Sequence, residues 1–134
     1  MYLLDTNILS ELVRKIPNKN LRGRLEKVPS ASLYTASICI MELRYGALRR
    51  EDSGALWSKM QESIISKLRV LAFGYKEALK AGEVLFTLHS IGQPIGVEDV
   101  LIGSIALSND LIVVTANTKH FSLIPDLSVE NWLM

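Results

Sequence analysis

Short apolar runs alternate with helical patterns along this chain, and that alternation limits the fold to few architectures. Four runs resemble buried strands and a fifth could add an edge strand; they are Tyr2–Asp5, Ser32–Thr35, Val70–Phe73, Leu111–Val114 and Ser128–Glu130. Strands that alternate with helices form a parallel sheet with helices on both faces. We therefore predict an α/β fold with a central parallel sheet of four to five strands.

The segments between these runs have the 3.6-residue apolar spacing of amphipathic helices. Turn-forming residues such as Pro17-Asn18 and Gly92-Gln93-Pro94 separate them. The predicted helices are approximately Asn7–Lys15, Asn20–Val28, Ser37–Arg50, Ser53–Lys67, Tyr75–Ser90 and Val97–Ser108. Ser37 is expected to cap the third of these helices.

Composition favours one packed domain. The chain has 134 residues, of which 49% are hydrophobic and 22% charged, so disorder is not expected. No linker or repeat divides residues 1–134. The single cysteine, Cys39, excludes an internal disulfide and is expected to be a buried small hydrophobe. No secretion signal or apolar stretch of about 18 residues is present, so we expect a soluble cytoplasmic protein without membrane contact.

Several acids interrupt apolar stretches far apart in the chain: Asp5, Glu42, Glu98 and Asp99. Asp5 is expected at the carboxyl end of a strand, where parallel sheets bind ligands, and Asn117 follows another strand. Each residue also has an ordinary explanation. Asp5 and the Glu98-Asp99 pair suit helix starts, Glu42 suits an exposed helix stripe, and Asn117 suits a turn.

Taken together, the acids indicate a cation site, because unpaired carboxylates at close range repel one another. Oxygen ligands without a His or Cys cluster favour Mg²⁺ or Mn²⁺ over Zn²⁺. We predict Asp5, Glu42 and Asp99 as metal ligands, with Asn117 completing the catalytic set. Thr6, Glu98 and Thr115 are predicted to have auxiliary roles at this site.

Basic residues are concentrated in the first part of the chain, where residues 1–50 hold nine Lys/Arg against four acids. A solvated helix surface would explain this excess; a surface that contacts phosphates is the alternative. If the excess marks a phosphate-contacting surface, the residues predicted to guide a nucleic acid along it are Arg14, Lys15, Arg22, Arg24 and Lys119. His120 could also touch a phosphate.

Four short motifs in this order resemble those of PIN-domain ribonucleases, specifically the toxins of VapBC-type toxin–antitoxin pairs. They are Leu4-Asp5-Thr6-Asn7, Glu42-Leu43-Arg44-Tyr45-Gly46, Pro94-Ile95-Gly96 with Glu98-Asp99, and Thr115-Ala116-Asn117 followed by Phe121. Pro125-Asp126-Leu127 and Trp132 resemble the family's tail. Each motif is short, but together they extend over nearly the whole chain.

The resemblance implies a five-stranded parallel sheet, a homodimer, Mg²⁺ or Mn²⁺, and endonucleolytic cleavage of RNA that inhibits translation and growth. Structured RNA such as tRNA is a plausible substrate class. The resemblance also implies a VapB-type antitoxin that blocks the acidic pocket and brings the toxin to operator DNA. One departure is Asn117, since many members have Asp there; some toxins of the family also have Asn. Glu98 is not a fixed position in the family.

Two other functions fit parts of the pattern. A phosphatase of the haloacid-dehalogenase kind would use Asp5 as nucleophile, but it needs an acid two residues later, where this chain has Asn7. A non-catalytic RNA-binding or interaction module with a decayed metal site is the remaining alternative. The three acids argue against it.

Overall fold

The computed structural model describes all 134 residues and contains one five-stranded sheet. The strands are β1 (Tyr2–Leu4), β2 (Leu33–Ala36), β3 (Arg69–Leu71), β4 (Ile112–Val114) and β5 (Val129–Glu130). Their order across the sheet is β3-β2-β1-β4-β5, and every neighbouring pair is parallel. The predicted parallel sheet and its edge strand are therefore confirmed.

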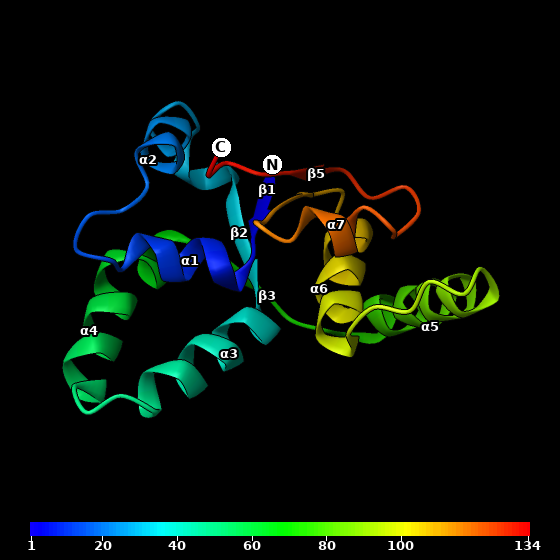
Figure 1. Cartoon of the computed structure of the whole chain (residues 1–134), viewed down its shortest axis with the longest axis horizontal. Helices are drawn as coiled ribbons and strands as arrows, with labels where there is room; N and C mark the ends of the chain where they lie inside the picture. The colour runs from blue at the N-terminus through cyan, green and yellow to red at the C-terminus, as the bar shows by residue number, and fades with distance from the viewer.

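Seven helices connect the strands. They are α1 (Thr6–Leu12), α2 (Lys19–Glu26), α3 (Ser37–Leu48), α4 (Ser53–Ser63), α5 (Tyr75–Ser90), α6 (Val97–Ser108) and α7 (Thr118–Phe121). Figure 1 shows α1 and α4 on one side of the sheet and α5 and α6 on the other. None of these helices combines the length and the apolar character that a membrane-spanning helix needs.

The core lies around the two central strands. Leu3 and Leu4 of β1 and Val113 and Val114 of β4 are at most 1% exposed, as expected for strands covered on both faces. Half of the residues of helix α6 are also buried. Gly103 on this helix allows close packing, because an added Cβ would lie 2.5 Å from Ile124 Cδ1. The central part of the sheet is thus held by packing on both sides.

Several predicted boundaries were wrong, while α5 and α6 match their predictions. Helix α1 ends at Leu12 instead of continuing to Lys15, and α4 ends at Ser63 before a short 3₁₀ turn. Ser37 is not the cap of α3, because Ala36 occupies that position and no side chain caps the helix. The short α7 was not predicted, since four residues leave too little periodicity to detect. Cys39 is fully buried, as predicted.

The order of the strands fixes the place where a ligand site is expected. From β1 the chain builds outward through β2 and β3, and it then returns to the other side of β1 with β4. The strand order therefore reverses between β1 and β4. In open α/β sheets, ligands bind at such a reversal, beyond the carboxyl ends of the strands.

Candidate metal-binding and active site

Asp5 follows β1 directly and is also the N-cap of α1. Its Oδ1 accepts a hydrogen bond of 2.8 Å from the Thr6 N–H, and the residue is only 4% exposed. The capping role and the position at the reversal of strand order are thus combined in one carboxylate. Helix capping, the ordinary explanation for Asp5, therefore does not exclude a role as a metal ligand.

A set of neutral donors fixes the Asp5 carboxylate. Thr115 Oγ1 donates to Asp5 Oδ2 over 2.8 Å, and Asn7 Nδ2 reaches the same oxygen at 3.3 Å. The Cys39 thiol lies 3.9 Å from Oδ1. Asn7 also accepts from the Ala116 N–H at 3.0 Å, so it joins the start of α1 to the loop after β4. None of these partners of Asp5 is positively charged.

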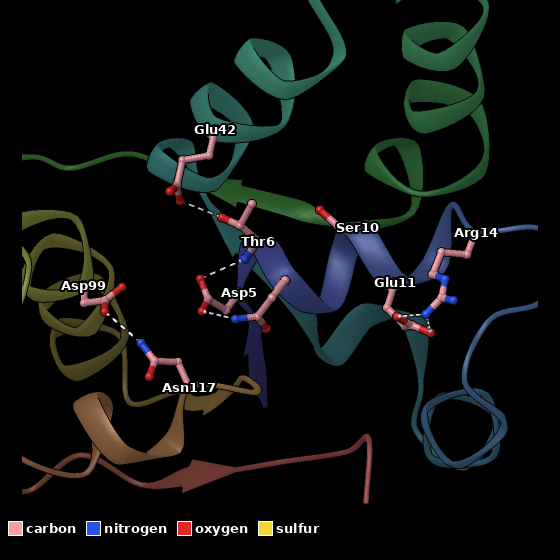
Figure 2. Close-up of a pocket in the computed structure, with 9 residues that line it drawn as sticks. Asp5, Thr6, Ser10, Glu11, Arg14, Glu42, Asp99 and Asn117 are labelled. Carbon is pink, nitrogen blue, oxygen red and sulfur yellow. Dashed lines mark hydrogen bonds and ion pairs between the residues drawn. The ribbon is translucent and has the colours of Figure 1, made fainter. Parts of the chain in front are cut away.

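Two further acids face the same space from other helices. Glu42 of α3 accepts a 2.6 Å hydrogen bond from Thr6 Oγ1, and Asp99 of α6 accepts one of 3.1 Å from Asn117 Nδ2. Figure 2 shows these side chains converging from α1, α3, α6 and the loop after β4. The cavity has a volume of about 640 Å³ and no hydrophobic lining; its residues are Asp5, Thr6, Asn7, Ser10, Glu11, Arg14, Glu42, Asp99 and Asn117.

Burial makes the ionised state of two of these acids unfavourable. Desolvation raises the pKa of Asp5, with the charge of Asp99 adding to the rise, while the bonds from Thr115 and Thr6 oppose it. Desolvation also raises the pKa of Asp99. The hydrogen bond and charge of His120 oppose this rise, and repulsion from Glu42 and Glu98 adds to it. A divalent cation in this pocket would relieve that repulsion.

The donor set suits a hard divalent ion. Ligand atoms of Asp5, Glu42 and Cys39 all lie within 4.8 Å of one another. Burial and the nearby charge of Asp5 raise the pKa of the Cys39 thiol to about 11. A protonated thiol is not a metal ligand, so the carboxylates of Asp5, Glu42 and Asp99 are the candidates. Carboxylate oxygens in a polar, open pocket fit Mg²⁺ or Mn²⁺.

The remaining residues singled out in the sequence divide into two groups. Thr115 is fully buried behind the pocket, where its hydroxyl also accepts from the Asn117 N–H at 2.9 Å. Glu98 is exposed and does not line the pocket. It acts on Asp99 only through charge.

The basic residues predicted to guide RNA are not gathered in one place. Arg14 lines the acidic pocket, and Lys15 lines the neighbouring cavity. Arg24 instead pairs with Glu130 at 2.8 Å and lies over the Trp132 ring at 5.3 Å. The last two, Arg22 and Lys119, are exposed and line neither cavity.

Three contacts of the site were missed at the level of sequence. Asn7 was assigned no role, although its spacing from Asp5 places it in the first turn of α1. Cys39 was expected to be a simple core residue. His120 lies 3.1 Å from Asn117 Nδ2 and 3.5 Å from Asp99 Oδ2; its spacing of three from Asn117 was the available signal.

Comparison with known proteins gives consistent matches. The PIN domain model matches residues 2–127. Ribonuclease VapC2 of Rickettsia felis is 32% identical over 132 residues, covering 98% of both chains. The tRNA(fMet)-specific endonuclease VapC of Salmonella typhimurium is 33% identical over 133 residues, or 98% of this chain and 97% of the other. The solved structure of VapBC2 from Rickettsia felis, bound to a DNA fragment from their promoter, aligns with a TM-score of 0.88 at 32% identity over 98% of both chains.

Proposed function

This chain belongs to the PIN-domain family and is related to VapC ribonucleases, and from that premise we propose that it is a divalent-metal-dependent endoribonuclease. In this role it is the toxin of a VapBC-type toxin–antitoxin pair. The observation that supports the proposal is the convergence of Asp5, Glu42 and Asp99 in one polar pocket. Cleavage of RNA phosphodiester bonds, and hence arrest of translation and growth, follows from it.

The proposed cofactor is Mg²⁺ or Mn²⁺, held by the three carboxylates. When bound, such an ion supplies Lewis acidity and positive charge for phosphodiester hydrolysis. The protein fixes the ligands beforehand: Asp5 by Thr115 and Thr6, and Glu42 by the Thr6 hydroxyl. Thr6 therefore orients two ligands at once, which gives its predicted auxiliary role a concrete form.

Asn117 occupies the fourth corner of the pocket and is neutral. Its side-chain N–H donates to Asp99 Oδ2, an arrangement that holds one oxygen of Asp99 and leaves the other oxygen open. An aspartate at position 117 would instead repel Asp99. We propose that Asn117 positions Asp99 and water, and that one ion is bound more strongly than any second one.

The proposed partners follow from the relatives. The related VapBC2 structure contains promoter DNA, so we propose a VapB-type antitoxin that blocks the acidic pocket and links this chain to operator DNA. A relative is described as a tRNA(fMet)-specific endonuclease, which makes tRNA or another structured RNA the substrate to test first. A homodimer is the proposed assembly.

Cleavage by the purified protein tests the proposal. After treatment with EDTA, the protein is titrated with Mn²⁺, Mg²⁺ or Zn²⁺ in the presence of tRNA and of unstructured RNA, and product ends are mapped. We expect cleavage that requires Mn²⁺ or Mg²⁺. Glu42→Gln should reduce it strongly, whereas Glu83→Gln on α5, outside the pocket, serves as the matched control. Cleavage that persists in EDTA, or that Glu42→Gln leaves intact, would contradict the proposal.

A further inference from the structure

A second cavity lies beside the acidic pocket and has a different character. It has a volume of about 670 Å³ and is formed by α1 and the turn after it, α3, and α4. Ser10, Arg14 and Glu42 line both cavities, so the two are continuous. We call this second cavity the basic groove, after the four cations that line it: Arg14, Lys15, Arg50 and Lys59.

Positive charge is in excess in the basic groove, because three acids oppose its four cations. Two of these acids, Glu42 and Asp52, line the groove, and the third, Glu11, pairs with Arg14 at 3.1 Å. Arg50 uses its Nε to bond Asp52 at 3.0 Å, and Lys59 donates to the Val13 carbonyl at 3.0 Å. A guanidinium has five N–H groups and an ammonium has three. Both side chains therefore keep donors available for a ligand.

The floor of the groove is apolar. The hydrophobic residues of its lining come from three elements and are Val13, Leu43, Ala47, Ala55, Leu56 and Met60. A ligand that combines anionic groups with flat apolar faces would match cations beside such a floor. Single-stranded nucleic acid has that combination, with phosphates on one edge and bases on the other.

The acidic pocket also needs such a neighbour. Phosphates on either side of a cleaved bond would be repelled by Asp5, Glu42 and Asp99, so binding requires cations farther along the strand. Figure 2 shows Arg14 beyond the opposite end of α1 from Asp5. The eight residue steps from Asp5 to Val13 span about 12 Å, which corresponds to roughly four stacked nucleotides.

We infer that the basic groove binds the RNA segment adjoining the cleaved bond, and this inference rests on the proposed ribonuclease function. The phosphates of that segment contact Arg14, Lys15, Arg50 and Lys59, and its bases pack on the apolar floor. The continuity of the groove with the acidic pocket favours RNA over the other class of matching ligand, an acidic peptide of a protein partner.

The double variant Arg50→Ala/Lys59→Ala tests this inference against Lys67→Ala/Lys80→Ala, which removes the same charge outside both cavities. Binding of labelled single-stranded RNA is measured by fluorescence anisotropy in EDTA at several salt concentrations. We expect the groove variant to raise the Kd roughly tenfold and to lower the salt slope by about 1.4, since each phosphate contact contributes about 0.7. Lys15→Glu, at an exposed position, should weaken binding in the same direction.

Cleavage gives a second readout. The ratio of kcat/KM for a long RNA to that for a dinucleotide should fall roughly tenfold in the groove variant relative to the control. Equal RNA affinity of the groove and control variants would overturn the inference. A groove variant that binds RNA normally but no longer binds the antitoxin would also overturn it, because that result would identify the groove as a peptide site. If the unsubstituted protein cleaves neither RNA with Mn²⁺, the proposed function fails separately, and anisotropy in EDTA still decides whether the groove binds RNA.

Discussion

Two buried carboxylates, Asp5 and Glu77, lie in contrasting environments although they are almost equally inaccessible, at 4% and 6% exposed. Glu77 lies in the first turn of α5, where its oxygens accept from the Gly74 N–H at 3.1 Å and from Asn109 Nδ2 at 3.4 Å. Lys76 Nζ is 3.9 Å away. Glu77 thus has a cation beside it as well as the positive end of a helix.

Asp5 has hydrogen-bond donors but no counter-charge. Its partners Thr6, Asn7 and Thr115 are neutral, and the charge of Asp99 in the same pocket raises the Asp5 pKa further. Burial alone therefore does not distinguish a candidate metal ligand from an acid with a structural role. The distinguishing property is a charge that is fixed in place but not compensated, because that charge is available to a cation.

The largest expected difference between the two acids is in catalysis. Asp5→Asn should lower RNA cleavage about 10³-fold, equivalent to about 4 kcal/mol of transition-state stabilisation, because it removes a charged ligand and keeps the side-chain shape. Glu77→Gln should cleave at a rate near that of the unsubstituted protein, measured at a temperature where both variants are folded. Equal losses of activity in the two variants would break the distinction.

The second-largest expected difference between Asp5 and Glu77 is in metal binding. At 100 times its Kd, a bound ion stabilises the folded protein by about 2.7 kcal/mol. Mn²⁺ should therefore raise the melting temperature of the unsubstituted protein and of Glu77→Gln, but not of Asp5→Asn. Differential scanning calorimetry with and without EDTA measures this effect. A Mn²⁺-induced shift that survives in Asp5→Asn would remove Asp5 from the ligand set.

Glu77 should matter more for stability than for activity. Glu77→Ala leaves the Gly74 N–H without its side-chain acceptor and leaves Asn109 Nδ2 with only the Ile105 carbonyl. We therefore expect a loss of about 1–3 kcal/mol in the free energy of unfolding. Urea unfolding followed by circular dichroism measures it. The exposed acid Glu83, which pairs with Lys80 at 3.6 Å on the same helix, gives a control; Glu83→Ala should cost well under 1 kcal/mol.

The smallest effect concerns the free-energy cost of ionising Asp99 in the metal-free pocket. The Asp99 pKa is raised above its ordinary 3.8, so the metal-free folded state is destabilised when Asp99 ionises, and this penalty disappears as the pH falls through the raised pKa. Asp99→Asn should therefore stabilise the EDTA-treated protein at pH 7 by less than about 1 kcal/mol. The gain should shrink toward pH 4. A destabilised variant at pH 7 would contradict this account.

Much of the fold could be read from local pattern. The helices α5 and α6 and the parallel arrangement were predicted correctly, and the five strands were placed to within two residues at each end. Periodicity and strand–helix alternation are properties of neighbouring residues, so they can be recognised without the fold. Helix ends were less accurate: the structure ends α1 at Leu12, and Ser37 is not the cap of α3. Such ends depend on which backbone groups find partners in the folded chain.

The pattern of motifs also identified the acids that line the pocket, but it could not identify the side chains that contact them. Asp5, Glu42, Asp99 and Asn117 line one pocket, while Glu98, next to Asp99 in the chain, remains outside it. Adjacent helical residues point in directions about 100° apart, so a one-residue difference decides which acid faces the site. The contact of Cys39 with Asp5, across 34 positions, was not predictable from spacing.

By itself, then, the sequence determined which residues are candidate metal ligands and which segments deliver them to the carboxyl ends of strands. Only the tertiary structure decided that Asp5 lacks a counter-charge while Glu77 has one, that Arg24 is paired with Glu130, and that Arg50 and Lys59 line a groove continuous with the acidic pocket. The physical reason is that charge compensation depends on distance through space, which packing of distant segments sets.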